Sequence, residues 1–138
     1  MPGTPPDNQD SLLKTGLGVH DDIQLDESGR AILTLDVQPH HCHAVAQGGY
    51  VTAWIDMAMA RAVFATSDED IGCNTLELKV SFYLPALVGQ RLLAEGWVVR
   101  KGRSIAFLEG ELRDEQGVVL ARATSTAKLS HFRDKAAG

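Results

Sequence analysis

The sequence predicts an α+β protein in which an antiparallel sheet wraps around one long, buried helix. The segment 47–66, QGGYVTAWIDMAMARAVFAT, is apolar on nearly every side and rich in alanine and methionine, as a buried helix is. The segments on either side of it alternate apolar and polar residues with the period of two that strands show. Short turns rich in Gly and Asp separate several of these segments, which favours hairpins.

The chain of 138 residues is expected to form one domain over residues 11–131, with disordered tails at 1–10 and 132–138. The expected order is a short helix at 11–17 capped by Ser11, a strand hairpin at 19–25 and 30–37, a loop at 39–46 and the long helix. Four strands in hairpin order follow, at 75–84, 91–100, 104–113 and 118–129. Two strand faces are expected to pack on the helix: Ala31, Leu33, Leu35 and Val37 on one strand, and Leu76, Leu78, Val80 and Phe82 on another.

Composition excludes several classes of function. The net charge of −5 argues against general nucleic-acid binding. The long apolar segment is short for a membrane span and carries Asp56 near its middle, so we expect no membrane association. Two cysteines, Cys42 and Cys73, make no disulfide framework, and the N-terminus lacks the order of a signal peptide. We therefore expect a cytoplasmic protein.

Asp56 and Gly48 are the first candidates for a functional site. A carboxylate within a core helix is costly unless it has partners or a chemical role. Gly48-Gly49 precede the helix, where free backbone N–H groups attract negative charge and glycine lets a ligand approach. Eight residues separate Gly48 from Asp56, which is roughly 12 Å on one straight helix. One small reacting group cannot touch both, so a shared site needs a second copy of the chain.

These features resemble the hotdog-fold acyl-CoA thioesterases, in the phenylacetyl-CoA thioesterase-like (PaaI-type) branch. That branch has an Asn, a Gly, then His-Gly-Gly, and an acid seven residues after the second glycine; Gly48-Gly49 and Asp56 match. Thr75, which opens TLELKVSFYLPA, matches the Ser or Thr that starts the next strand, and the last three strands are also similar. The resemblance covers roughly residues 17–130. His41 stands in place of the Asn, Ala44 in place of the loop Gly, and Gln47 in place of the His.

The resemblance implies hydrolysis of acyl-CoA thioesters without a cofactor. Asp56 would be the nucleophile or general base, and the Gly48 N–H would polarise the thioester carbonyl. Thr75 would position the water or Asp56, and His41 would lie beside the carbonyl. Gln47 and Gly49 would border the substrate. Gly48 and His41 would then come from one subunit and Asp56 and Thr75 from its partner, so the chain is expected to be a homodimer or homotetramer.

Two other clusters carry separate hypotheses. Arg100, Lys101 and Arg103 form the main basic cluster of an acidic chain and could meet the phosphates of coenzyme A, although a solvated hairpin tip would look the same. The run at 40–43, His-His-Cys-His, contains metal-ligand residue types. Adjacent residues of an extended loop point alternately and no second ligand pair follows, so we expect no metal site.

Two other classes of function remain open. A hotdog dehydratase or isomerase would pair His41 or His43 with Asp56, and an acyl-CoA-binding domain would need no acid at all. The glycine pair and Thr75 favour hydrolysis over the first, and the presence of Asp56 argues against the second. The sequence leaves open the acyl group, the choice between dimer and tetramer, and whether Asp56 acts as nucleophile or base.

Overall fold

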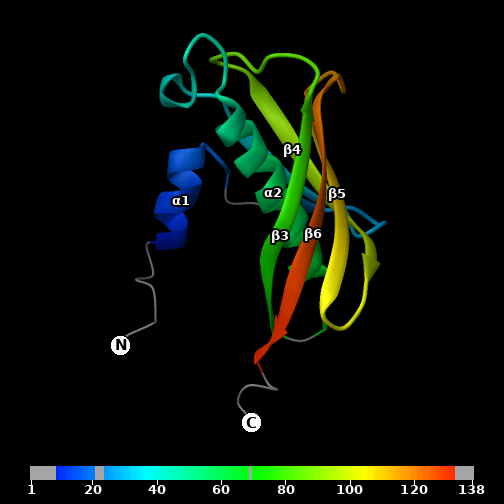
Figure 1. Ribbon diagram of the computed structural model, residues 1–138. Helices are drawn as coiled ribbons and strands as arrows, with labels where there is room; N and C mark the ends of the chain where they lie inside the picture. Colours follow the sequence, from blue (N-terminus) through cyan, green and yellow to red (C-terminus); the bar gives the residue numbers. More distant parts are fainter. Residues whose placement is uncertain (1–8, 21–23, 69, 133–138) are drawn as a thin grey trace.

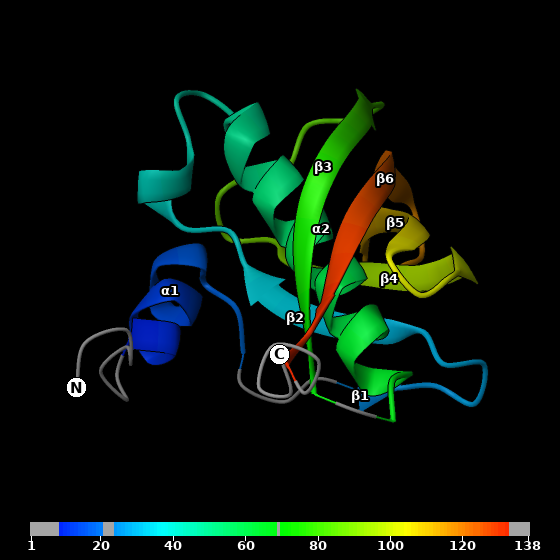
Figure 2. The same cartoon turned by 60° about the horizontal axis from the view of Figure 1, so that its bottom comes forward.

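The computed structural model describes residues 9–20, 24–68 and 70–132. Within these residues the antiparallel strands form one six-stranded sheet in the order β1-β2-β4-β5-β6-β3. The sheet curves around α2, and α1 lies outside it, beside the N-terminal part of α2 (Figures 1 and 2). The elements are α1 (Gln9–Leu17), β1 (Gln24–Leu25), β2 (Ala31–Asp36), the 3₁₀ helix η1 (Pro39–His41), α2 (Gly48–Ala65), β3 (Ile71–Phe82), β4 (Arg91–Lys101), β5 (Ile105–Asp114) and β6 (Val119–His131). The predicted fold class is confirmed.

The predicted hairpin order of the last four strands is wrong for the first of them. Strands β4, β5 and β6 are consecutive neighbours, but β3 pairs with β6 and not with β4. The free side of β4 is taken by β2, which precedes the long helix. Because α2 crosses the sheet between β2 and β3, the chain leaves at one side of the sheet and returns at the opposite edge, where β3 lies next to β6 (Figure 1).

Several predicted boundaries also shift. Helix α1 begins at Gln9, inside the tail that was expected to be disordered, so Ser11 lies within the helix and is not its cap. Residues 1–8, 21–23 and 133–138, which include parts of both tails and of the expected first strand, lie outside the described residues. What remains of that strand is Gln24–Leu25 and an isolated bridge between Val19 and Leu35. Strand β3 begins at Ile71, four residues earlier than expected.

The core lies between α2 and the concave face of the sheet. The largest fully buried side chains of the helix are those of Trp54, Ile55 and Met59. Gly96 and Gly110 face each other on β4 and β5, and a Cβ on Gly96 would lie 2.4 Å from the Met59 nitrogen. These glycines let the helix lie directly on the strands, a contact that sets the position of every side chain on α2. Neither described helix has the length and apolar character needed to cross a membrane.

Strand β3 forms one edge of the sheet, and its alternation is interrupted. Its register against β6 shifts between Thr75 and Glu77, which marks a β-bulge. The bulge turns Leu76 outward, so this side chain is 59% exposed and does not face the helix as expected. Leu78 and Val80 do pack against the core, as predicted.

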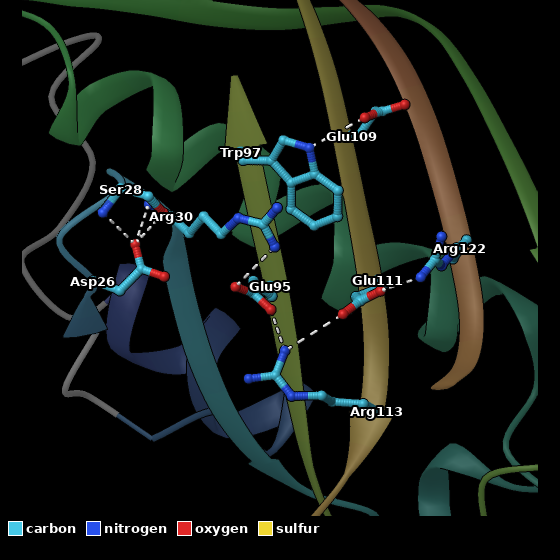
Figure 3. Close-up of polar contacts among 9 residues, drawn as sticks. All are labelled: Asp26, Ser28, Arg30, Glu95, Trp97, Glu109, Glu111, Arg113 and Arg122. Atoms are coloured by element: carbon cyan, nitrogen blue, oxygen red, sulfur yellow. Dashed lines mark hydrogen bonds and ion pairs between the residues drawn. The ribbon is translucent and has the colours of Figure 1, made fainter. Parts of the chain in front are cut away.

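The convex face of the sheet carries a ladder of charged side chains that runs from Arg30, just before β2, across β4, β5 and β6 (Figure 3). Arg30 bonds Glu95 at 3.4 Å, Glu95 pairs with Arg113, and Glu111 pairs with both Arg113 (3.6 Å) and Arg122 (3.2 Å). The Arg30 guanidinium also lies 4.1 Å from the ring centroid of Trp97, whose Nε1–H donates to Glu109 at 3.1 Å. Alternating signs on neighbouring strands stabilise cross-strand pairing on this polar face.

Candidate functional site

The N-terminus of α2 leaves one backbone donor without an acceptor. The Gln47 side-chain oxygen accepts from the Gly49 N–H at 2.7 Å, and the Gln47 carbonyl accepts from Tyr50 and Val51. Together with the Gln47 N–H, which is also bonded, the Gly49 and Tyr50 bonds satisfy three of the four amides that the start of a helix leaves exposed. Within the described part of the chain, the Gly48 N–H has no acceptor, and Gly48 borders a pocket. This amide is therefore an available donor at the positive end of the helix dipole.

The pocket beside Gly48 has a volume of about 330 Å³. A Cβ on Gly48 would lie 3.2 Å from the Phe82 ring, so only a glycine leaves this space between the helix end and the strand open. The loop before α2 is joined to the segment after β3 by a bond from the Ala46 N–H to the Ala86 carbonyl at 2.8 Å. Apart from Gly48, the lining is largely apolar: Val45, Ala46, Val51, Phe82, Tyr83, Leu84, Pro85 and Ala86.

Asp56 lies in the middle of α2 and faces the start of β3. It is partly buried, and its Oδ1 accepts a hydrogen bond from the Thr75 hydroxyl at 2.9 Å. Cys73 lies on the same side of the strand; its burial, and then the charge of Asp56, raise the pKa of this thiol. A thiol with a raised pKa stays protonated at neutral pH. The structure thus brings together two of the predicted site residues, Asp56 and Thr75.

The two halves of the predicted site lie beside different parts of β3. Gly48 lies against Phe82 at the last residue of the strand, whereas Asp56 bonds Thr75 in its first half. Since one helix carries both Gly48 and Asp56, the separation of roughly 12 Å along its axis holds in the folded chain. A single chain does not bring these two groups onto one small reacting group.

His41 lies away from the solvent, with a fully buried side chain. Its Nε2 bonds the Gly16 carbonyl at 2.8 Å, and its Nδ1 accepts from the Gln38 N–H at 2.9 Å. Both ring nitrogens are therefore engaged inside the chain. This geometry does not support the direct contact with a substrate carbonyl that the resemblance implied for His41.

Residues 43–121 match the family model described as thioesterase superfamily, which is more than half of the chain. The chain belongs to the thioesterase superfamily. A candidate esterase of Caenorhabditis elegans is 32% identical over 99 residues, covering 69% of this chain and 58% of its own, so the match spans under two thirds of that relative.

Solved structures place this chain in the hotdog fold of the PaaI type, which confirms the fold that the sequence motifs implied. A phenylacetic acid degradation-related candidate thioesterase of Ralstonia eutropha JMP134 is 27% identical, with a TM-score of 0.76 over 92% of this chain and 93% of its own. The PaaI protein of Escherichia coli aligns with a TM-score of 0.75 at 20% identity over 85% and 83%. The protein smu.793 of Streptococcus mutans UA159, solved with acetyl-CoA, aligns with a TM-score of 0.72 at 22% identity over 80% and 88%.

The basic cluster of residues 100–103 lies at the far end of α2 from Gly48. Lys101 donates to the Thr66 carbonyl at 3.1 Å and to the Ser67 hydroxyl at 2.9 Å, just beyond the helix C-terminus. Lys101 and Arg103 also line a pocket of about 240 Å³ there, and Arg100 is exposed on β4. Eighteen residues separate Gly48 from Thr66, which is roughly 27 Å along a helix.

Residues 40–42 of the His-His-Cys-His run make hydrogen bonds that hold the loop before α2. His40 and His41 both bond the Gly16 carbonyl, and the Cys42 thiol donates to the Gln38 carbonyl at 3.7 Å. In the described part of the chain, no three His, Cys, Asp or Glu side chains are grouped to hold a metal ion.

The sequence did not indicate that Phe82 borders the site, or that α2 packs directly on the backbone at Gly96. Phe82 was expected to face the helix, but its position over Gly48 depends on how far β3 runs along α2. Gly96 is a strand glycine without a turn, which is the signal for a close backbone approach.

Proposed function

We propose that this chain hydrolyses acyl-CoA thioesters at a site that two copies of the chain share. The observation that carries the proposal is the pair of half-sites on one edge strand. The available Gly48 N–H lies at the last residue of β3, and the Asp56–Thr75 pair lies in the first half of the strand. Neither half can bind and hydrolyse a thioester alone, because hydrolysis needs both a donor for the oxyanion and a base or nucleophile.

Edge pairing of two β3 strands would join these halves. In the described chain β3 pairs only with β6, so its other edge is open to a second copy. Two-fold symmetry makes such a pair antiparallel, and an axis near the middle of β3 brings the Gly48 end of one copy opposite the Asp56 end of the other. The exposed apolar side chains of Leu76 (59%) and Phe82 (55%) would be covered in this dimer.

Charge favours one register of this pairing. Glu77 and Lys79 point to the convex face, where they pair with Thr126 and Thr124 of β6. With the axis at Leu78, Glu77 of each copy lies opposite Lys79 of the partner subunit, giving two favourable pairs. With the axis at Lys79, two like charges would face each other.

The chemistry then assigns one role to each group. The Gly48 N–H polarises the thioester carbonyl and stabilises the developing oxyanion. Asp56 of the partner subunit attacks the carbonyl carbon or takes the proton of an attacking water, and Thr75 holds its carboxylate in place through the 2.9 Å bond. The largely apolar pocket beside Gly48 holds the non-reacting part of the substrate next to Gln47 and Gly49.

The proposal that the substrate is a coenzyme A thioester is supported by the S. mutans protein, whose structure was solved with acetyl-CoA. The basic cluster of residues 100–103 is too far from Gly48 of its own chain to meet a ligand bound there. It is closer to Asp56, so in a shared site the cluster belongs to the subunit that supplies the acid. We propose that Arg100, Lys101 and Arg103 of that subunit meet the coenzyme phosphates.

The engaged ring of His41 weighs against dehydration. A dehydratase site would need an imidazole opposite the acid; both ring nitrogens of His41 are engaged inside the chain, which leaves only the exposed His43 of the two imidazoles considered above. A dimer is the minimum assembly, and a tetramer would be a dimer of such pairs. The two cysteines are free and fit the reducing cytoplasm in which we propose that the enzyme acts.

The test is a panel of acyl-CoA thioesters with aryl, short and medium aliphatic acyl groups, followed by release of free thiol. We expect thiol release for at least one of these substrates, with the free acid as the second product. Hydration of an enoyl thioester without thiol release would favour the dehydratase. Binding of acyl-CoA without any turnover would favour a non-catalytic domain.

A further inference from the structure

His41 makes four hydrogen bonds to three other parts of the chain. Its ring bonds the Gly16 carbonyl at the end of α1 and the Gln38 N–H at the start of η1. Its backbone N–H donates to the Gln38 carbonyl at 3.0 Å, and its carbonyl accepts from the Gln47 N–H at 2.9 Å. The side chain is fully buried, and its ring packs 5.2 Å from the Trp54 ring in the core. No water therefore competes for these bonds.

The two ring partners fix the protonation state of His41. A backbone N–H can only donate, so Nδ1, which accepts from Gln38, carries no proton. A carbonyl oxygen can only accept, so Nε2 carries the proton and donates to Gly16. His41 is thus a neutral imidazole in one tautomer. A second proton would place an N–H against the Gln38 N–H and break that bond.

These bonds lead directly to the Gly48 donor. The His41 carbonyl holds the Gln47 N–H, and the Gln47 side chain caps the Gly49 N–H. Gln47 has φ −67° and ψ 139°, an extended conformation that starts the helix at the next residue. The direction of the Gly48 N–H therefore depends on how firmly His41 holds the loop.

We propose that His41 is a positioning residue that aims the Gly48 N–H at the thioester carbonyl, and that it does so only as a neutral imidazole. The proposal rests on the proposed function for its catalytic consequence. The geometry of the loop and its dependence on pH can be measured without turnover. His41 is thereby given a role different from the direct carbonyl contact that the resemblance implied.

The surroundings of His41 favour the neutral form. Burial lowers its pKa from the usual 6.5, the bond to Gly16 opposes this shift, and His40 adds to it. The ring of His40 lies 4.1 Å away and that of Tyr50 4.7 Å away. Further titratable groups on the packed elements include Lys14 on α1, Cys42 and the exposed His43 on the loop, and Asp56 and Arg61 on α2. Asp36 on β2 bonds His20 and Arg91 through its carboxylate.

The sign of the pH effect follows from this lowered pKa. Between the usual pKa of 6.5 and the lower value in the folded chain, the unfolded chain binds a proton at His41 that the folded chain does not. The contribution of His41 to stability is therefore complete above pH 6.5 and decreases as the pH falls. Below the folded pKa, His41 becomes charged in the native state and the Gln38 bond is lost.

Two substitutions separate the two ring bonds. In His41→Asn the amide oxygen stands near the position of Nδ1 and can still accept from Gln38, but the side chain cannot reach Gly16. In His41→Gln the amide nitrogen stands near Nε2 and can still donate to Gly16, but nothing accepts from Gln38. The control is His40→Gln, which changes the neighbouring imidazole that bonds the same Gly16 carbonyl.

The experiment measures kcat and KM at neutral pH, the free energy of unfolding from pH 7.5 to 5, and amide hydrogen exchange over residues 47–51. We expect His41→Gln to lower kcat by about 10-fold or more, towards the 10²–10³-fold loss of an oxyanion donor, with KM nearly unchanged. His41→Asn should lose less, and both should flatten the pH dependence of stability relative to the His40→Gln control.

Hydrogen exchange separates this proposal from the proposed function. If the wild-type protein hydrolyses no acyl-CoA, the proposed function fails, and exchange still tests the role of His41. We expect exchange at residues 47–51, corrected for its intrinsic dependence on pH, to accelerate on acidification in the wild type. In His41→Gln it should already be fast at neutral pH. Exchange in His41→Gln equal to that of His40→Gln, at every pH, would overturn the proposal.

Discussion

The two half-sites on α2 differ in how completely one chain builds them. At the N-terminus, Gly48 is held by a loop whose hydrogen bonds are nearly all satisfied within the chain, and a pocket lies beside it. In the middle of the helix, Asp56 has one described hydrogen-bond partner, Thr75, on an open strand edge. The first half is preorganised in the monomer, and the second faces the place where another copy would bind. The difference fits the proposed dimer, in which substrate binding and catalysis would both depend on the edge of β3.

The largest expected effect is on the acid. Asp56→Asn should keep the fold, because the amide is nearly isosteric, and should lower kcat by about 10²–10⁴-fold, the range for a lost acid–base group. The matched control is Asp68→Asn, an exposed carboxylate just beyond the same helix. Thioester turnover and thermal melting on both variants decide the role: a lower melting temperature with unchanged turnover would make Asp56 a structural residue.

The next effect concerns the donor at the other half-site. Gly48 is the first helical residue, where proline is tolerated, and the extended Gln47 before it suits a following proline. Gly48→Pro removes the N–H, adds a ring at this position and should lower kcat by about 10²–10³-fold. Gly48→Ala keeps the N–H at a similar steric cost against Phe82 and serves as the control. Equal losses in the two variants would point to crowding of the pocket instead.

A smaller effect, on the stability of the dimer, is expected when the charges that set the register between two β3 strands are reversed. Lys79→Glu should weaken the dimer about tenfold in Kd, since two favourable cross-strand pairs become repulsive. Adding Glu77→Lys in the same chain should restore the dimer, because the charges are then exchanged. Lys128→Glu, on the neighbouring β6 and away from the edge, is the control. Sedimentation at a series of concentrations measures this, and a double variant as weak as Lys79→Glu would rule out the register.

The smallest effect is expected at Thr75. Thr75→Val keeps the shape and removes the hydroxyl that bonds Asp56, so kcat should fall by less than about tenfold, the scale of one hydrogen bond. Steady-state kinetics with Thr75→Ser as the control measures it. A loss as large as that of Asp56→Asn would show that the hydroxyl takes a direct part in the reaction.

The sequence predicted the parts of the molecule that depend on local pattern. The helix of α2 follows from its apolar, Ala-rich run, and the meeting of Asp56 with Thr75 followed from motifs with a known arrangement. The edge position of β3 was not predictable, because strand order depends on which strands lie closest after the helix has crossed the sheet. The alternation of apolar and polar residues also predicted that Leu76 would face the core. A β-bulge cannot be recognised from that alternation, so the prediction for Leu76 was wrong.

Long-range contacts account for the remaining differences. His41 occupies the position of a family Asn, but its ring reaches Gly16, twenty-five residues earlier, and no local pattern indicates that bond. Likewise, the basic residues of 100–103 were predicted as a cluster, but their place at the C-terminus of α2 depends on the length of β4. Sequence patterns predict which residue types are available, and the packing of distant segments decides what they contact.

The shared site itself is tested most directly by mixing two inactive chains. Asp56→Asn and Gly48→Pro are each inactive for a different reason, and random exchange makes half of the dimers mixed. One of the two sites in each mixed dimer inherits both intact halves, so activity should return to about a quarter of the wild-type level. Continued inactivity after exchange, with mixed dimers demonstrated by mass spectrometry, would contradict a site shared between subunits.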